Sequence, residues 1–369
     1  MAAVSSSTTI AATGSQRNPL LFFPKTLNPT KPSFLPFKSN QTLAPVSMSI
    51  TSQSSKKQAS FSRIRAAASS LVPDPGSHNP DSRTLKSRLA AGETLYGLFL
   101  LSFSPTLAEI AGLAGYDYVV VDMEHGPGGI AEALPCLRAL AAARTPAILR
   151  LPEPSAAWAK KALDLGPQGL MFPTIETPAA AELAVSYCRF PPRGVRGSAH
   201  TLVRASAYGI DDGYLARVEE ELLVMCQVET TAGVAEIEAI AAVEGVDVVQ
   251  MGPLDLSASM GYLWDPGNRN VRGVMKDAER RVLGMRKKVV PAEGGGGERG
   301  PYLGGFAMPH DRPEDLKLRG YHMVAGAVDL GIFRQVAVED VRRWRSAEVE
   351  IGEEDDEDEK AKDDEYWSE

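Results

Sequence analysis

The sequence predicts a single (β/α)₈ barrel over residues 73–346, on three observations. Eight short apolar runs fall within about 260 residues, the usual size of one such barrel. The runs are continuously apolar, as is typical of strands that are covered on both faces. Segments with helical character alternate with them, as a parallel barrel requires. The runs lie at 95–102, 116–125, 146–152, 169–175, 221–230, 246–255, 302–309 and 321–330.

The segments between the runs carry signals for helix ends. Ser104 precedes Pro105 and Gly115 closes the same segment, while Thr177 precedes Pro178 in a second one. A hydroxyl side chain before proline is typical of a helix start, and glycine of a helix end. The competing architecture is an open doubly wound sheet, but no G-x-G-x-x-G follows the first predicted strand. The pattern therefore favours the barrel.

Two connections between the predicted strands are long. Residues 188–220 contain PPRGVRGSAHTLVRASAYG, and residues 253–301 contain a helical stretch followed by AEGGGGERG. No Gly-Lys-Ser/Thr follows these glycines, so they lack the signature of a phosphate-binding loop. We interpret the glycine run as a flexible insertion before a strand, at the end of the barrel that serves stability.

Both ends of the chain differ in composition from its middle. Residues 1–72 hold eight Lys or Arg and no acid, are rich in Ser, Thr and Pro, and end near SRIRAAASS. This composition predicts an organelle transit peptide, with the chloroplast stroma first and the mitochondrion second, the alternative being an ordinary disordered leader. Residues 347–369 hold thirteen acids and two lysines, which predicts a solvated acidic tail. Such a tail promotes solubility or docks a basic partner.

Composition narrows the classes of partner. The net charge of the chain is −8, and that of residues 73–346 is −5. The sequence shows no basic stretch with interleaved aromatic residues, so nucleic acid is not an expected partner. No stretch approaches the roughly 20 apolar residues of a membrane-spanning helix. The chain has three cysteines, Cys136, Cys188 and Cys226, an odd and widely spaced set. We interpret them as buried thiols in a reducing compartment.

Polar residues gather where the predicted strands end. Asp122, Glu124 and His125 follow the second strand, and Arg150 ends the third. Gln227 and Glu229 end the fifth, and Asp255 follows the sixth. In a barrel the carboxyl ends of the strands form one rim, where catalytic residues lie. The sequence therefore predicts that these side chains converge on one site.

Each of these residues has a catalytic and a structural interpretation. Glu229 and Asp255 suit a hard cation such as Mg²⁺ or Mn²⁺, but either could cap the helix that follows it. His125 could be a general base whose tautomer Asp122 fixes, or a structural histidine. Arg150 needs an ion-pair partner, either substrate or protein, because a buried unpaired guanidinium is costly.

Seven motifs in order resemble the HpcH/HpaI family of class II pyruvate-dependent aldolases. They are VVVDMEHGP, LRLP, FPTIET, YCRFPPRGVRG, QVET, GPLDLSASMGY and VAGAVDLGIFR, and together they span about residues 85–345. More narrowly, they are similar to those of the 2-keto-3-deoxyglucarate and 4-hydroxy-2-oxoheptanedioate aldolases.

The resemblance implies roles for the site residues. Glu229 and Asp255 would bind Mg²⁺ or Mn²⁺, with Co²⁺ as a further candidate. Arg150 would stabilise an enolate, and His125, paired with Asp122, would be the base.

The same resemblance implies how the substrate and other subunits bind. Gln227 would lie beside the metal site, and the backbone amides of Leu254 and Asp255 would meet the carboxylate of a small keto-acid substrate. The last helix would be swapped between subunits of a homo-oligomer, usually a hexamer. Family members commonly carry a small residue where this chain has Leu254, which predicts a narrower mouth. The glycine insertion and the unusual helix sequence PHDRPEDLKLRG around the seventh strand also predict an altered aldehyde side.

The expected function is reversible cleavage of 4-hydroxy-2-oxo acids, such as 2-keto-3-deoxy sugar acids, to pyruvate and an aldehyde. No Lys lies in the predicted strands, which argues against a Schiff-base aldolase. One alternative is a CoA-thioester lyase of the citrate lyase β type, which would need a basic groove. Another is a barrel that binds a keto acid without turnover.

Overall fold

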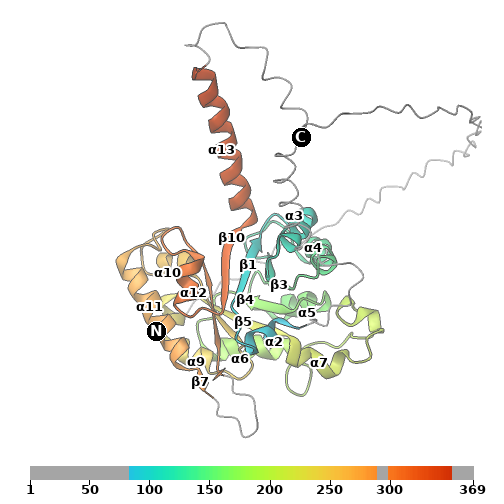
Figure 1. Cartoon of the computed structure of the whole chain (residues 1–369). Coiled ribbons are helices and arrows are strands. Elements are labelled where there is room, and N and C mark those ends of the chain that lie inside the picture. Colours follow the sequence, from blue (N-terminus) through green and yellow to red (C-terminus); the bar gives the residue numbers. More distant parts are fainter. Residues whose placement is uncertain (1–82, 289–297, 351–369) are drawn as a thin grey trace, which may run out of the picture. The chain divides into compact units, whose positions relative to one another are not determined.

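A computed structural model describes residues 83–288 and 298–350 (Figure 1). The predicted leader therefore lies outside the described residues. So does the predicted tail, apart from residues 347–350, and so do the glycines of the insertion.

Eight parallel strands close into a barrel, which confirms the predicted fold. Around the barrel the order is β1–β10–β9–β6–β5–β4–β3–β2, so chain neighbours are also neighbours in space. Every predicted apolar run contains one of these strands. Their bounds are β1 Leu95–Leu100, β2 Tyr118–Asp122, β3 Ala147–Arg150, β4 Gly169–Phe172, β5 Leu223–Val228, β6 Val248–Met251, β9 Tyr302–Phe306 and β10 Met323–Val328.

Helices surround the barrel in Figure 1 and connect its strands. The α-helices are α2 Leu85–Ala90, α3 Pro105–Ala114, α4 Ile130–Ala142, α5 Ala156–Asp164, α6 Pro178–Cys188, α7 Tyr214–Glu221, α8 Thr231–Ala235, α9 Ile237–Ala241, α10 Pro253–Ser259, α11 Arg269–Gly284, α12 Pro313–Leu318 and α13 Asp329–Glu350, with a 3₁₀ segment η1 at Arg204–Gly209. Within the described ranges, none of these helices is both long and apolar enough to cross a membrane.

The helix signals in the sequence act as expected. The Ser104 side chain accepts a hydrogen bond from the Leu107 N–H at the start of α3, and the Thr177 side chain accepts one from Ala180 N–H in α6. Gly115 ends α3 with φ 96°, a left-handed conformation that favours glycine. These local bonds fix where each helix begins and ends.

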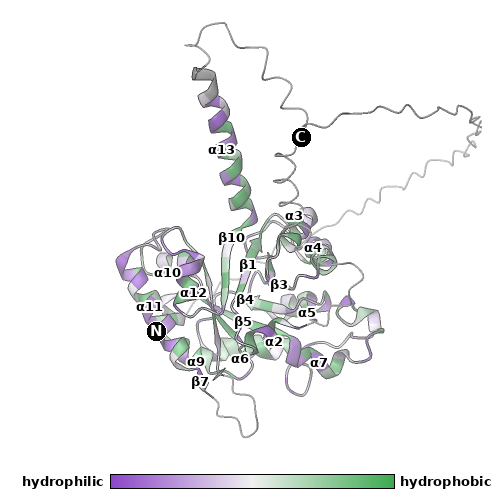
Figure 2. Ribbon diagram, viewed as in Figure 1, coloured by the Kyte–Doolittle hydropathy of each residue, from purple (hydrophilic) through white to green (hydrophobic). Residues whose placement is uncertain are grey.

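The core has two layers, one on each face of the barrel wall. In β2, Val119 and Val121 pack outward against the helices, while Tyr118 and Val120 fill the interior. Hydrophobic residues accordingly run through the labelled barrel strands β1, β4, β5 and β10 in Figure 2. Leu89 of α2 joins the interior layer. Because strand side chains alternate in direction, the sequence position of a residue decides which layer it joins.

Three features complete the description of the fold. A two-stranded ribbon, β7 Lys287–Lys288 with β8 Glu298–Arg299, precedes β9 at the amino end of that strand and was not predicted. Helix α13 continues to Glu350, past the predicted boundary at residue 346. Cys136, Cys188 and Cys226 are free and buried, as predicted.

Candidate active site

The strand alternation that fills the barrel interior also delivers polar residues to its carboxyl end. Tyr118 and Val120 point inward in β2, and two positions later Asp122 continues the same face. In β3, Ile148 points inward and Arg150 follows in phase. A charged residue at the last inward position of a strand therefore faces the mouth of the barrel.

The same rule holds on the next part of the rim. Met225 of β5 is interior, and Gln227 and Glu229 follow at two-residue steps. Val248 of β6 is interior and Gln250 follows. Gln227 and Gln250 are register partners across the two strands, and both side chains line the same cavity.

Arg150 is held by protein carboxylates. Its Nε donates to Asp122 Oδ1 at 2.8 Å and its Nη2 to Asp122 Oδ2 at 2.5 Å, because Asp122 and Arg150 are register partners on adjacent strands. The guanidinium also lies over the ring of Phe99, 5.0 Å from its centroid. Burial lowers the pKa of Arg150, but the bond to Asp122 and the charges of Asp122, Glu124 and Glu229 together outweigh this effect and raise it. The ion-pair partner of Arg150 is therefore a protein carboxylate, that of Asp122.

Asp122 does not meet the imidazole of His125 as the family resemblance implied. Both Asp122 oxygens bond Arg150, and Oδ1 also accepts the backbone N–H groups of Glu124 and His125. The carboxylate thus fixes the backbone before the histidine and orients the guanidinium. The His125 side chain is 56% exposed at the mouth of the barrel.

Glu124 takes the place beside the histidine, a role that the sequence analysis did not assign to it. Its Oε2 lies 3.9 Å from His125 Nε2 and 2.9 Å from Arg150 Nη1. The approach to Arg150 is an ion-pair contact without hydrogen-bond geometry, which leaves this buried oxygen without a hydrogen bond. Burial, together with the charges of Glu229 and Asp122, raises the Glu124 pKa to about 7 against the effect of Arg150. The position of Glu124 in the sequence, between Asp122 and His125 at a strand end, was the signal that could have identified it.

Glu229 is buried and held from several sides. Its Oε1 accepts the Thr174 N–H at 2.8 Å and the Thr174 hydroxyl at 3.1 Å, while the Gln227 amide donates to Oε2. Thr174 adopts φ 49°, an uncommon conformation for a residue with a branched side chain. This strained threonine in the FPTIET motif was not predicted as a site residue. Its two donors fix the direction of the carboxylate.

Neither Glu229 nor Asp255 acts as the helix cap that the sequence left open. Thr230 caps α8 through its side chain, and Gly252 occupies the cap position of α10. Asp255 is exposed in the first turn of α10, and no hydrogen bond engages its carboxylate. A Cβ on Gly252 would lie 2.5 Å from Glu229 Oε2, so only glycine lets α10 begin this close to the carboxylate.

The two acids suit a shared cation. Burial raises the Glu229 pKa, and the Asp255 charge adds to the effect. Arg150 contacts Asp122 and Glu124, and the charges of Glu229 and Asp255 act on Glu124 as well, so acids outnumber bases in this part of the described structure. The described residues contain no group of three or more His, Cys, Asp or Glu placed to hold a metal. The pair Glu229 and Asp255 would therefore leave further coordination positions to water or substrate.

These side chains line a cavity of about 380 Å³ at the carboxyl end of the barrel. Its polar lining comes from His125, Arg150, Gln227, Gln250 and Asp255, and buried Glu229 lies directly behind Gln227 and Gly252. A Cβ at Gly304 would lie 2.3 Å from Gln250 Oε1, so this glycine keeps room for the amide. The structure thus brings together every predicted site residue, with Leu254 at the cavity wall.

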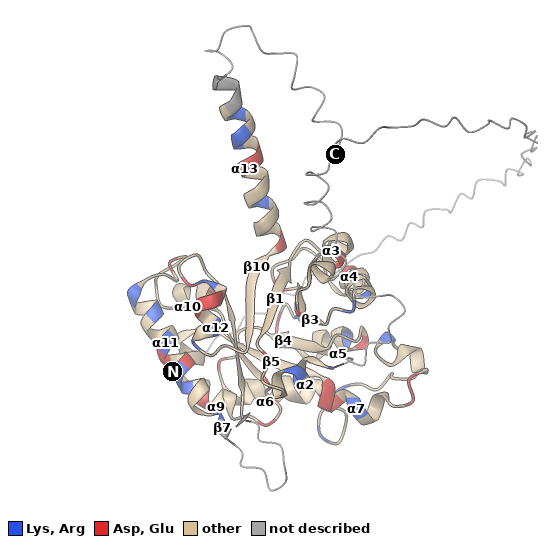
Figure 3. Cartoon of the chain, in the orientation of Figure 1, with Lys and Arg blue, Asp and Glu red and all other residues tan. Residues whose placement is uncertain are grey.

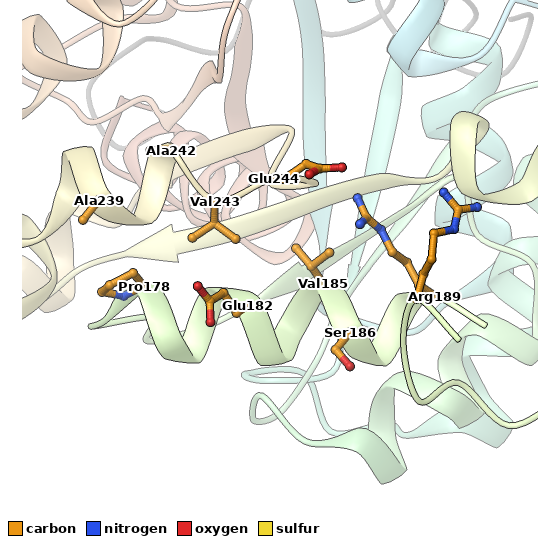
Figure 4. Close-up of a pocket in the computed structure, with 10 residues that line it drawn as sticks. Pro178, Glu182, Val185, Ser186, Arg189, Ala239, Ala242, Val243 and Glu244 are labelled. Atoms are coloured by element: carbon orange, nitrogen blue, oxygen red, sulfur yellow. The ribbon is translucent and has the colours of Figure 1, made fainter. Parts of the chain in front are cut away.

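A second hollow, of about 420 Å³, lies between α6 and α9 on the outside of the barrel (Figure 4). In Figure 4, Glu182 and Arg189 come from the α6 side and Glu244 from the α9 side. None of the polar strand-end residues reaches it. Convergence of strand-end polar groups, and not volume, therefore identifies the candidate site.

A family model described as HpcH/HpaI aldolase/citrate lyase matches residues 95–336. The chain belongs to this family. A hydroxypyruvate/pyruvate aldolase of Deinococcus radiodurans is 41% identical over 58% of this chain and 78% of its own length. A 2-keto-3-deoxy-L-rhamnonate aldolase of Salmonella gallinarum is 37% identical over 56% of this chain and 77% of its own length.

A solved structure supports the same assignment. The crystal structure of an HpcH/HpaI aldolase/citrate lyase family protein from Burkholderia cenocepacia is 35% identical. It aligns over 71% of this chain and 98% of its own length, with a TM-score of 0.64. The resemblance noted in the sequence is thereby confirmed at the level of the family.

Proposed function

We propose that this protein is a divalent-metal-dependent aldolase. It cleaves 4-hydroxy-2-oxo acids to pyruvate, or a close analogue, and an aldehyde. The observation that carries the proposal is the excess of acids over bases at one cavity, with Glu229 fixed and Asp255 left unbonded. Family membership and the names of the aldolase relatives support the reaction class.

Glu229 and Asp255 would hold the cation, and Mg²⁺ or Mn²⁺ suits their oxygen ligands. A divalent ion bound there supplies Lewis-acid polarisation of the 2-oxo group. Leu254 and Asp255 lie in the first turn of α10, where backbone N–H groups lack helical acceptors. These amides would meet the substrate carboxylate.

Arg150 would stabilise the charge that develops on the substrate. When the C3–C4 bond breaks, its electron pair moves to C3 and C2 and negative charge grows on the 2-oxo oxygen. The guanidinium is already fixed by two bonds to Asp122, so it needs no reorganisation to meet that oxygen. Burial around it strengthens the interaction.

His125 would accept the proton of the 4-hydroxyl group as C4 becomes the aldehyde carbonyl. Its exposed position at the mouth suits the aldehyde side of the substrate. Glu124 Oε2, 3.9 Å from Nε2, can exchange this proton near neutral pH because its pKa is about 7. The enolate carbon C3 then takes a proton to give pyruvate.

The test is retro-aldol cleavage of a series of 4-hydroxy-2-oxo acids by the full chain, with and without EDTA. We expect cleavage that EDTA abolishes and Mg²⁺ or Mn²⁺ restores. Glu229→Gln should lower kcat by about a thousandfold or more, as loss of transition-state electrostatics does. Glu244→Gln, in the outer hollow of Figure 4, is the matched control and should leave kcat unchanged. Undiminished cleavage by Glu229→Gln would reject the proposal, and binding of pyruvate without any turnover would favour the non-catalytic alternative.

We also propose that α13 packs against a second copy of the chain. Large apolar side chains remain exposed along it, including Phe333 at 71% and Trp344 at 69%, and Figure 2 shows hydrophobic residues along its length. A contiguous exposed apolar helix face is typical of an interface. Light scattering should give an oligomer for the full chain, and Phe333→Glu with Trp344→Glu should shift it to a smaller species; a monomeric full chain would contradict this.

Residues 1–72 lie outside the described residues, and we propose from their composition that they direct the chain to the chloroplast stroma. A fluorescent protein fused after residue 72 should enter plastids in plant cells. Mitochondrial or cytosolic fluorescence would contradict the proposal.

A further inference from the structure

The cavity has a polar and an apolar side, and the order of the strands separates them. The polar lining residues follow β2, β3, β5 and β6, which occupy one continuous arc of the barrel. The remaining arc, β1–β10–β9, contributes Leu101, Val328 and Phe306 to the cavity wall. No charged side chain comes from this second arc into the cavity.

The segment after β6 continues the apolar side over the mouth. Leu254, in the first turn of α10, and Leu263 and Trp264, in the turn after this helix, line the cavity. Leu263 is 72% exposed and Trp264 is 77% exposed, so two adjacent large apolar residues remain in solvent at the edge of a candidate active site. Neighbouring exposed residues of this size mark binding surfaces.

The turn that carries Trp264 is fixed by polar bonds on its other residues. The Tyr262 hydroxyl accepts from Asn270 Nδ2 at 2.6 Å, and Tyr262 N–H donates to Ser257 O at 2.8 Å. Asn268 Nδ2 donates to Asp265 Oδ2 at 3.2 Å. Trp264 itself adopts φ 60°, an unusual conformation for a bulky side chain. The hydrogen bonds of the turn therefore hold the Trp264 indole at the cavity. The backbone preference of tryptophan and the burial of its side chain do not favour this position.

We propose that Leu254, Leu263 and Trp264, with the β1–β10–β9 arc, form the aldehyde subsite and select aldehydes that carry an apolar or aromatic group. The inference rests on the proposed aldolase function, because it assigns the aldehyde end of the same substrate. The cation pair and Arg150 would serve the 2-oxo acid end, and His125 lines the same cavity. Hydroxyl groups on the aldehyde would lose water against this wall, where the Trp264 indole N–H is the one polar side-chain group among the residues named and donates a single hydrogen bond.

The experiment compares aldol addition of pyruvate to aldehydes of matched length. Propanal and D-glyceraldehyde share a three-carbon chain and differ in two hydroxyl groups, and 3-phenylpropanal adds a ring. We expect kcat/KM to increase from glyceraldehyde to propanal to 3-phenylpropanal, by about tenfold or more across the series. Trp264→Ser and Leu263→Ala should each lower kcat/KM for 3-phenylpropanal by about tenfold and change it little for glyceraldehyde, and Trp264→Phe should restore most of the loss.

Leu318→Ser is the matched control, because Leu318 is 85% exposed at the end of α12 and does not line the cavity. Deuterium exchange at the pyruvate methyl group, followed by NMR, reports on the 2-oxo acid side alone. Loss of exchange in the wild type would reject the aldolase proposal itself. Two outcomes would overturn the aldehyde subsite alone, provided that deuterium exchange at pyruvate is still observed. One is a higher kcat/KM for glyceraldehyde than for the apolar aldehydes, and the other is a Trp264→Ser variant whose oligomeric mass changes while its kcat/KM values do not.

Discussion

The two ends of the barrel both carry charge, but they balance it differently. At the amino end, Lys86 of α2 lies 2.9 Å from Asp247, and Arg88 lies 2.6 Å from Asp117. Each of these acids also accepts a strand N–H, from Val224 and Tyr96 respectively. At the carboxyl end, Arg150 pairs with Asp122 and Glu124, while Glu229 and Asp255 have no basic partner among the described residues.

The difference shows which charges serve the fold and which are kept for a ligand. Paired acids at the amino end fix strand ends and hold α2, whose Leu89 closes the barrel interior. At the carboxyl end, burial and the charges of neighbouring acids raise the pKa of Glu124 and Glu229, and the Asp255 carboxylate makes no hydrogen bond. Elsewhere on the outer helices, acidic and basic residues are interspersed, as α11 and α13 in Figure 3 show. The imbalance is therefore local to the cavity.

The largest expected effect comes from Arg150→Ala. It removes the partner of fully buried Asp122, so the free energy of unfolding should fall by about 3–5 kcal/mol. Retro-aldol activity should fall by about a thousandfold. Urea unfolding and a cleavage assay measure the two effects. Arg150→Lys should recover little of either, because a lysine cannot make both bonds to Asp122; full recovery would contradict the role of the bidentate pair.

The raised pKa of Glu124 predicts how stability depends on pH. Its folded pKa is about 7 against an ordinary value of 4.5. The folded state thus binds more protons between these values, and stability falls as pH increases through this window. Without divalent ions the loss should reach up to about 3 kcal/mol. Urea midpoints at pH 5 and pH 8 measure it, and Glu124→Gln should flatten the profile; an unchanged profile in the variant would assign the dependence elsewhere.

Divalent cations should stabilise the wild type but not the variant at Glu229. At a hundredfold excess over Kd, binding to the folded state alone adds about 2.7 kcal/mol. Tm should therefore increase with Mg²⁺ or Mn²⁺ in the wild type. Without the ion, Glu229→Gln should change Tm little, because it removes a charge that burial and Asp255 disfavour but also removes the acceptor of the Gln227 amide. A Tm that increases equally in both proteins would place the cation outside the proposed pair.

Asp247→Ala tests the opposite end of the barrel. It removes an ion pair with Lys86 and a bond to the Val224 N–H, so the free energy of unfolding should fall by about 2 kcal/mol. Activity should stay within about twofold of the wild type. Activity lost with no change in stability would show that charge at the two ends does not separate as we describe.

The eight strands, both ends of α3 and the start of α6 could be predicted from the sequence because they depend on local free energies. Continuous apolar runs, the hydroxyl caps Ser104 and Thr177, and Gly115 act within a few residues of chain. The polar strand ends were also visible, since parallel strands in a barrel share one rim. The β7–β8 ribbon was missed because two-residue strands carry no periodic signal.

The sequence by itself determined the strands, the caps of α3 and α6, and which charged residues end the strands. Only the tertiary structure decided which of those residues meet. Register across β2 and β3 placed Asp122 on Arg150 instead of on the histidine ring, and the turn after β4 placed Thr174 on Glu229. These partners lie tens of residues apart, and their contacts arise from barrel closure, which no local pattern encodes.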